Sequence, residues 1–228
     1  MKRPSLRTRT KHFLQHFLPT RFPPLVVASM GRSGSTLIWD GLRESMARQR
    51  FGRFHEFGTR LVSDYAWNLD EATFANGVVY KTHDVASAMP QNTRAKVIFV
   101  FGPASDAALS VVSCRDRYGE AWIEEHFEHL HSSGRFEDLG HKDVLRFEEQ
   151  IEGWLNLTGV ARAIIHYDAL WEYEDELSAF CGIPLKLPQR KSRVGVSKID
   201  LPTQAQFERT YAALDERIAS LPRFQILK

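Results

Sequence analysis

Short apolar runs alternate along the chain with longer segments in which apolar and polar positions are mixed. Runs of β-strand length lie at 25–28, 77–83, 96–101 and 163–167. Apolar positions at helical spacing predict helices over 36–47, 106–113, 144–157, 170–181 and 205–221. Strands that alternate with helices predict an α/β fold in three layers, in which helices flank a central, mostly parallel sheet.

The composition is that of an ordinary globular protein, with 43% apolar and 25% charged residues among 228. No apolar run reaches the length of about eighteen residues that a membrane span needs. The first residues lack the continuous apolar segment of a secretory signal. Cys114 and Cys181 lie in apolar surroundings, so we expect a reduced, cytoplasmic chain with both thiols as small core residues.

Basic side chains gather at the N-terminus, where prolines separate an arm of residues 1–22 from the rest of the chain. Within the arm six residues are basic and none is acidic: Lys2, Arg3, Arg7, Arg9, Lys11 and Arg21. We expect a solvated, frayed arm whose charge suits peripheral contact with an anionic membrane, and no nucleic-acid partner. Residues 23–228 are expected to form a single domain, and the sequence does not indicate an oligomeric state.

A short loop rich in glycine and hydroxyl residues joins the first predicted strand to the first predicted helix. It comprises Gly31, Arg32, Ser33, Gly34, Ser35 and Thr36. Glycines allow the backbone to approach an anion, and the free amides at a helix start favour negative charge. The Gly-Lys-Ser/Thr ending of an ATP-binding loop is absent. The loop therefore predicts a site for another phosphate-bearing ligand, the alternative being a tight turn in which a serine caps the helix.

The second predicted strand ends in Lys81, Thr82 and His83. Lys81 and His83 are two residues apart, so in an extended strand their side chains share a face. One is a cation and the other is a candidate base near neutral pH. The alternative is a solvated strand end with no chemical role.

Together these motifs resemble the sulfotransferases that use 3′-phosphoadenosine 5′-phosphosulfate (PAPS). The loop 31–36 is similar to the family's phosphosulfate loop, with Arg32 in place of the usual lysine, and Lys81-Thr82-His83 matches its Lys-Thr-His strand end. Ser110, on the helix after the strand 96–101, corresponds to the serine that binds the 3′-phosphate. Weaker similarities cover Trp154-Leu155, the segment 166–170, and Arg190 with Lys191, so the resemblance spans about 25–215.

The resemblance implies a P-loop-like sulfotransferase architecture and metal-independent transfer of a sulfuryl group from PAPS to a hydroxyl or an amine, leaving PAP. The implied catalytic residues are His83 as the base, with Lys81 and Arg32 stabilising charge. The loop residues, Ser110, Arg190 and Lys191 are the implied cofactor-binding residues. The acceptor, a small molecule, glycan or lipid, is not specified.

The chain departs from the family at two positions that bear on the 3′-phosphate. Gly102 stands eight residues before Ser110, where the family usually has an arginine, and Ser192 replaces the glycine of its Arg-Lys-Gly stretch. Compensating charge is expected from Arg190, Lys191, Arg193 or Arg115. Two alternatives stay open: a phosphotransferase that holds Mg²⁺ on Asp168, and a binding protein that has lost activity.

Two further segments contain groups with potential chemistry. His126, His129 and His131 match no zinc-binding pattern, so we expect a polar or substrate-facing segment that helps to shape the acceptor pocket. Residues 51–65 are expected to form a loop on the sheet, with His55 or Glu56 as an alternative base.

Overall fold

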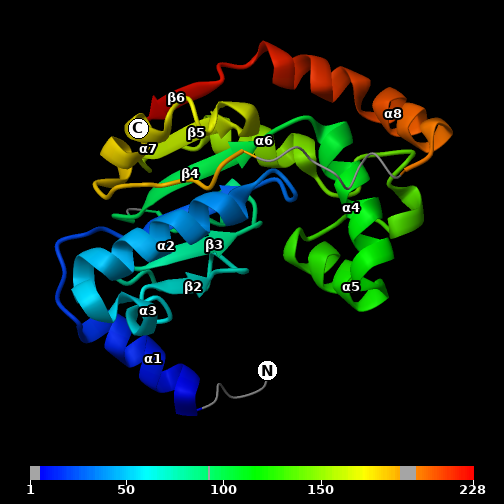
Figure 1. The fold of residues 1–228 in the computed structure, drawn as a ribbon. Helices are drawn as coiled ribbons and strands as arrows, with labels where there is room; N and C mark the ends of the chain where they lie inside the picture. Colours follow the sequence, from blue (N-terminus) through cyan, green and yellow to red (C-terminus); the bar gives the residue numbers. More distant parts are fainter. Residues whose placement is uncertain (1–5, 92, 191–198) are drawn as a thin grey trace.

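Six strands form one central sheet in the order β2-β3-β1-β4-β5-β6 in the computed structural model, which describes residues 6–91, 93–190 and 199–228. The strands are β1 (Leu25–Ser29), β2 (Ser63–Tyr65), β3 (Val79–Thr82), β4 (Lys96–Phe101), β5 (Arg162–His166) and β6 (Phe224–Leu227). All neighbouring strands are parallel except β6, which runs antiparallel to β5 (Figure 1). The predicted, mostly parallel sheet is thereby confirmed.

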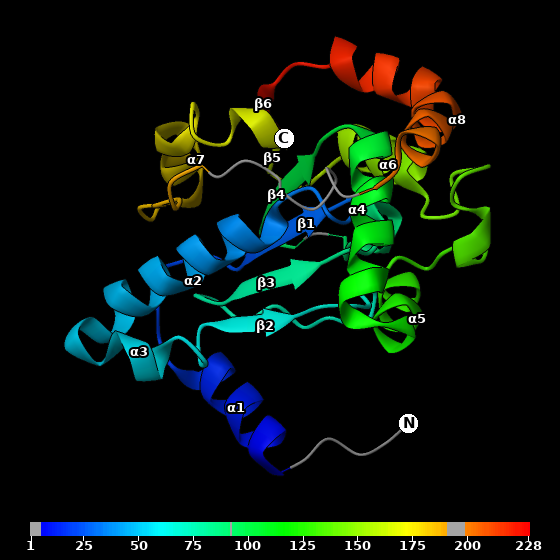
Figure 2. The same cartoon turned by 45° about the vertical axis from the view of Figure 1, so that its right-hand side comes forward.

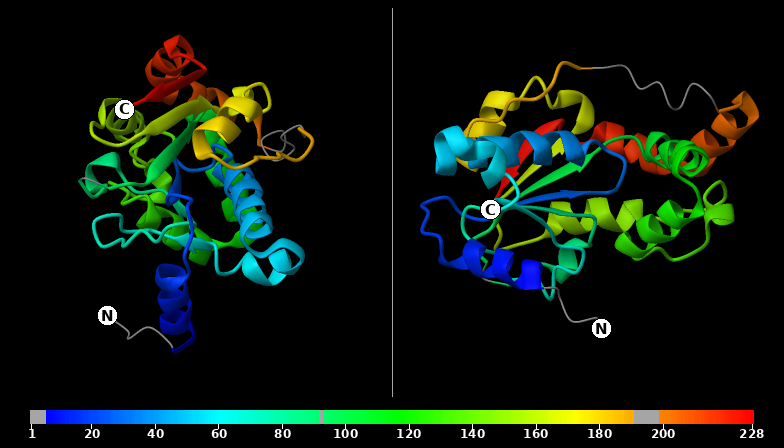
Figure 3. Two further views of the ribbon diagram at one scale, coloured as in Figure 1. Left: turned by 90° about the vertical axis from the view of Figure 1, so that its left-hand side faces the viewer. Right: turned by 60° about the horizontal axis from the view of Figure 1, so that its bottom comes forward.

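Helices cover both faces of the sheet. The α-helices are α1 (Leu6–Phe17), α2 (Ser35–Phe51), α3 (His55–Gly58), α4 (Ala104–Tyr118), α5 (Glu120–His129), α6 (Phe147–Asn156), α7 (Glu174–Cys181) and α8 (Leu201–Ser220). One core contains side chains of α2 and α7, and the other contains side chains of α4, α6 and α8. Figure 3 shows α2 and α6 on opposite sides of the strands, so the fold has the predicted three layers.

The apolar strands bury side chains on both faces because helices cover both. Along β1, Val26 and Ala28 belong to one core, whereas Leu25 and Val27 belong to the other. This two-sided burial explains why the sequence shows nearly continuous apolar runs instead of an alternating pattern. Cys114 and Cys181 are buried free thiols, as expected.

The structure differs from the expected elements mainly at the edges of the sheet. The strand 96–101 is β4, with the predicted bounds. Residues 51–65, expected to be a loop, instead contain a 3₁₀ turn, α3 and the edge strand β2. With only three residues, β2 is too short to show a periodic pattern, and β6 was missed because none of its four residues is fully buried.

The N-terminal arm contains a helix, in contrast to the expectation of a frayed terminus. Its residue Lys11 forms an ion pair with Asp64 of β2 at 3.0 Å, and His12 lies 3.4 Å from the same carboxylate. Figure 1 shows α1 projecting from the body of the protein beside α3. Among the described residues, no helix is both long and apolar enough to cross a membrane.

Two helices stand over the carboxyl ends of the parallel strands. In Figure 2 the arrowheads of β2 and β3 point toward α4 and α5. Asp215 of α8 accepts hydrogen bonds from the backbone amides of Ala104 and Ser105 at the start of α4. A distant carboxylate therefore satisfies the free amides of the helix that carries Ser110, and this contact fixes α4 over the strand ends.

Candidate active site

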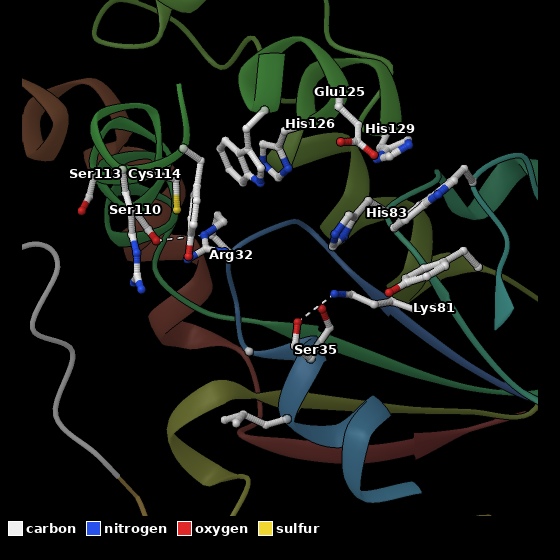
Figure 4. A pocket seen from close by; sticks show the side chains of 18 of the residues that line it. Arg32, Ser35, Lys81, His83, Ser110, Ser113, Cys114, Glu125, His126 and His129 are labelled. Atoms are coloured by element: carbon white, nitrogen blue, oxygen red, sulfur yellow. Dashed lines mark hydrogen bonds between the residues drawn. The ribbon is translucent and has the colours of Figure 1, made fainter. Parts of the chain in front are cut away.

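The polar segments that end β1 and β3 border one cavity of about 700 Å³ together with α4 and α5. Its lining includes Arg32, Lys81, His83 and Ser110, which the sequence predicts as site residues. Figure 4 shows their side chains around the same hollow, with His126 and His129 of α5 on its far side. Ligands bind beyond the carboxyl ends of parallel strands in such folds, so the position fits a functional site.

The loop after β1 adopts a conformation that requires glycine. Gly31, Arg32 and Gly34 have positive φ angles of 85°, 51° and 92°. A Cβ on Gly34 would lie only 2.4 Å from the Tyr167 ring, so an alanine does not fit without movement. Arg32 has a backbone conformation that is uncommon outside glycine and clusters at functional sites. The loop delivers the chain to the N-terminus of α2, a 17-residue helix whose N-cap, Gly34, has no side chain to satisfy the first amides.

The three loop hydroxyls have different surroundings. Ser33 donates to the carbonyl of Val100 in β4 at 2.9 Å, so its hydroxyl faces the protein. Ser35 accepts a hydrogen bond from Ser29 at 3.0 Å, and Thr36 accepts one from Lys81 at 2.7 Å. Ser35 and Thr36 line the cavity, whereas the hydroxyl of Ser33 serves to attach the loop to the sheet.

Two cations line the cavity, one from the loop and one from β3. Lys81 extends from β3, and Arg32 donates through Nε to the hydroxyl of Ser110 on α4 at 3.0 Å. The pKa of Lys81 is lowered to about 8, mainly by burial; the charge of Asp40 opposes this shift and that of Arg32 adds to it. A partly desolvated lysine and an exposed arginine beside free helix amides form an anion-binding arrangement.

His83 is held in one orientation from two directions. Its Nδ1 lies 3.0 Å from the hydroxyl and 3.3 Å from the carbonyl oxygen of Ser29. Gln150 of α6 donates to the carbonyl of His83, and Trp154 donates to the Gln150 side chain at 3.1 Å, which fixes the orientation of that amide. Because a carbonyl oxygen only accepts, it favours the tautomer with the proton on Nδ1 and a lone pair on Nε2.

The environment of His83 also keeps its ring neutral. The side chain is only 8% exposed. Burial lowers the pKa of His83 well below its usual value, and the nearby His126 and Lys81 lower it further. A neutral imidazole with a lone pair on Nε2 can accept a proton at physiological pH.

One face of α4 presents further polar groups to the cavity. Ser110, Ser113 and Arg117 follow each other at spacings of three and four residues and all line the cavity. Arg117 is a cationic residue that no motif in the sequence indicates. Arg115, a predicted source of compensating charge, forms an ion pair with Glu120 at 2.5 Å and is absent from the lining.

The position of the missing family arginine has room for a side chain. A Cβ on Gly102 would lie 3.6 Å from Tyr167, an ordinary contact. Steric crowding at the first side-chain atom therefore does not explain the glycine. Of the other basic candidates, Arg190 forms an ion pair with Asp168, while Lys191 and Arg193 lie outside the described residues.

The same ion pair bears on the phosphotransferase alternative. Asp168, its proposed Mg²⁺ ligand, is about half exposed, pairs with Arg190 and is absent from the cavity lining. His55 and Glu56 are not part of this lining either: His55 lies 3.2 Å from the carbonyl of Gly52, and Glu56 borders a second cavity beside α1. The structure therefore does not bring these alternative groups to the predicted site.

Aromatic rings from two segments line part of the cavity. Trp67 stacks on Tyr65, on His83 and on His129, with ring centroids 4.9, 5.6 and 3.9 Å apart. Trp122 stacks on His126 at 4.6 Å. Pairwise stacking of this kind holds rings rigidly, and it gives the cavity a flat apolar wall.

The three clustered histidines have three different partners. His126 packs on Trp122 and His129 on Trp67, whereas His131 lies 3.2 Å from the carboxylate of Asp84. His126 and His129 line the cavity, as expected for a substrate-facing segment, and His131 does not. Within the described residues, no group of three or more His, Cys, Asp or Glu side chains is arranged to hold a metal ion.

Several site residues had no recognisable pattern in the sequence. Ser29, Trp67, Arg117 and Gln150 come from four separate segments, and none of them belongs to a motif. Ser29, at the end of an otherwise apolar strand, was the one local indication of a site residue, because a hydroxyl buried there needs a hydrogen-bond partner.

Comparison with known proteins gives matches among solved structures alone: no protein-family model and no curated protein matches the chain. The chain is similar to retinol dehydratase in complex with retinol and PAP, with 15% identity over 92% of this chain and 69% of that chain, and a TM-score of 0.44. It is also similar to retinol dehydratase in complex with androsterone and inactive cofactor PAP, with 15% identity over 90% and 69% of the two chains, and a TM-score of 0.43. We therefore base the assignment of function on the residues of the site and their geometry.

Proposed function

We propose that this protein is a PAPS-dependent sulfotransferase that moves a sulfuryl group to a hydroxyl or an amine. One observation carries the proposal: a neutral histidine, two cations and a glycine-rich helix start border the same cavity. Sulfuryl transfer needs these three elements, namely a base for the acceptor proton, positive charge for the leaving phosphate and a cradle for the donor.

The residues present fit the anionic parts of PAPS. Gly34 lines the cavity without a side chain, so a ligand can come close to its backbone, and the amides of α2 suit the 5′-phosphosulfate. On the face of α4, Ser110 and Arg117 would hold the 3′-phosphate, and Arg117 would replace the charge that Gly102 does not provide. PAPS supplies an activated sulfuryl group whose leaving group is the phosphate of PAP.

We assign one residue to the acceptor proton and two to the charge on the leaving phosphate. His83 accepts the acceptor proton on Nε2, while its Nδ1 keeps the hydrogen bond to Ser29. Lys81 and Arg32 stabilise the negative charge that develops on the leaving phosphate. We propose metal-independent transfer because both cations border the cavity and would stabilise that charge, and because a sulfuryl group carries less charge than a phosphoryl group.

The acceptor is proposed to enter along the aromatic wall. Tyr65 and Trp67 border the cavity next to His83 and suit the flat face of a small molecule, a glycan or a lipid. Peripheral membrane contact through residues 1–22 stays a prediction, and in α1 the neighbouring Phe13 and Phe17 are exposed and stacked.

Calorimetry with adenosine 3′,5′-bisphosphate (PAP) tests the proposal most directly. We expect PAP to bind with micromolar affinity and at least about tenfold more tightly than AMP, because only PAP carries the 3′-phosphate. No binding at millimolar PAP would contradict the proposal. Magnesium-dependent ATP turnover would favour the phosphotransferase instead.

The Arg117→Ala variant tests where the 3′-phosphate binds. It should remove most of the preference for PAP over AMP while leaving AMP affinity nearly unchanged. Arg115→Ala is the matched control, because Arg115 lies on the same helix but pairs with Glu120. Equal losses in both variants would show a general effect of positive charge and not a contact at this position.

The lowered pKa of Lys81 predicts that PAP affinity falls at alkaline pH. With a pKa of about 8, Lys81 in the free protein is charged at pH 7 and mostly neutral at pH 9. The phosphates of PAP are fully ionised over this range, since their second pKa is about 6. We expect about a tenfold loss of affinity between pH 7 and pH 9, measured by calorimetry.

The Lys81→Met variant provides the control for this pH dependence. It should bind PAP weakly, and its affinity should change little between pH 7 and pH 9. If the variant still lost about tenfold in PAP affinity between pH 7 and pH 9, a group other than Lys81 would be responsible for the pH dependence.

A further inference from the structure

A nitrogen without a hydrogen-bond partner lies in the wall of the cavity, beside the start of the loop. His126 is only 6% exposed, and its Nε2 is buried without a hydrogen-bond partner among the described residues. A buried polar atom without a partner costs about 1–3 kcal/mol. Such atoms are rare in folded proteins and call for an explanation, and a ligand that supplies the missing partner provides one.

The ring of His126 is fixed against the glycine-rich loop. A Cβ on Gly31 would lie 3.4 Å from Cε1 and 3.5 Å from Nε2 of His126, so the edge of the imidazole occupies the place next to Gly31 that a side chain would need. Trp122 stacks on its face at 4.6 Å and 15°. The ring therefore has little freedom to turn Nε2 away.

His126 also lies beside the proposed base. The rings of His83 and His126 meet edge to face with centroids 5.9 Å apart, and both line the cavity. The acceptor must be next to His83 for its proton to be removed. The group being transferred must then be close to both histidines and to the loop.

The surroundings of His126 keep its ring neutral. Burial, as the largest cause, and the charges of Arg32, His129 and Lys81 together lower the pKa of His126 to about 3. A neutral imidazole can donate one N–H without adding a third positive charge beside Arg32 and Lys81. Since sulfuryl oxygens only accept hydrogen bonds, their contact requires the proton on Nε2.

We infer that His126 is a further catalytic residue of the proposed sulfuryl transfer, donating Nε2–H to a non-bridging oxygen of the transferred group. The inference rests on the proposed function. In the step, the bond from the acceptor to sulfur forms, and the bond from sulfur to the phosphate oxygen breaks with its electron pair going to PAP. The acceptor proton goes to His83, while His126 keeps its own proton and stabilises the charge on the sulfuryl oxygens.

Two variants that differ in the placement of a donor test this role. Phenylalanine at position 126 keeps a ring on Trp122 but has no donor. We expect His126→Phe to lower kcat about 10²-fold, with PAP affinity within about threefold of the unchanged protein. His126→Gln, which places an amide NH₂ close to the position of Nε2, should recover at least about tenfold of the loss.

Binding without an acceptor gives a readout that does not depend on turnover. The unchanged protein should bind PAPS several-fold more tightly than PAP, and His126→Phe should lose this preference while His126→Gln keeps it. Should the phenylalanine variant unfold, His126→Asn replaces it, because its shorter amide does not reach the Nε2 position.

The outcomes separate the inference from the proposed function. An unchanged protein that binds neither PAP nor PAPS overturns both. If the unchanged protein binds PAP but His126→Phe keeps both its kcat and its preference for PAPS over PAP, only the role of His126 is overturned. Loss of PAP affinity equal to the loss of PAPS affinity overturns it as well, because the residue would then support only the shape of the loop.

Discussion

Replacing His83 by alanine should lower kcat by about 10²–10⁴-fold, the usual contribution of a general base. The variant lacks the group that takes the acceptor proton, whereas Arg32, Lys81 and the loop amides still hold the nucleotide. PAP affinity should therefore stay within a few-fold of its original value. Initial rates at saturating PAPS, together with calorimetry on the same preparation, measure the two effects separately.

A matched control uses a histidine outside the cavity. His141 lies on an exposed segment and does not line the cavity, so His141→Ala should leave kcat unchanged. If His83→Ala showed normal turnover, a residue other than His83 would be the general base. A parallel collapse of PAP affinity would instead show that His83 shapes the site, since Ser29 connects it to the loop.

Adding a single methyl group at Gly34 should both destabilise the protein and abolish tight nucleotide binding. The residue has a φ of 92°, and a Cβ there would lie 2.4 Å from the Tyr167 ring. Left-handed strain and overpacking each cost about 1–3 kcal/mol. For a chain of this size we expect Gly34→Ala to lower Tm by about 5–15 °C and PAP affinity by more than about tenfold.

Gly182 provides the control that separates strain from crowding. It has a similar left-handed conformation at the end of α7, with φ 73° and ψ 17°, but nothing lies within 4 Å of the position that a Cβ would take there. Gly182→Ala should therefore show only the strain, about 1 kcal/mol, and no change in PAP binding. If the two alanine variants lost the same stability, the contact with Tyr167 would contribute nothing.

The elements of the fold that the sequence predicted well are those with strong local patterns. The strand 96–101 has no polar residue after Lys96, and its bounds were correct to the residue. Edge elements such as β2 and β6 bury little surface, so they show no comparable pattern. The helix within the N-terminal arm was also missed, because its contacts with Asp64 join segments far apart in the sequence.

The candidate site was predictable where a contiguous motif carries the chemistry. The loop 31–36 and the segment Lys81-Thr82-His83 place glycines, hydroxyls, cations and an imidazole at fixed short spacings, and the parallel sheet brings them to one edge. The assignment of Ser33 as a ligand through its hydroxyl stays a prediction that its bond to Val100 does not favour.

The sequence by itself determined the class of the fold and the chemical groups on two strand ends, because both depend on neighbouring residues. Only the tertiary structure decided that Ser29 and Gln150 orient His83, that Arg117 reaches the cavity while Arg115 does not, and that His126 lies on Gly31. These relations join segments from 29 to 150, and their geometry depends on how helices pack on a sheet. Burial and neighbouring charge, which set the pKa values of His83 and Lys81, arise in the same way from packing and not from local sequence.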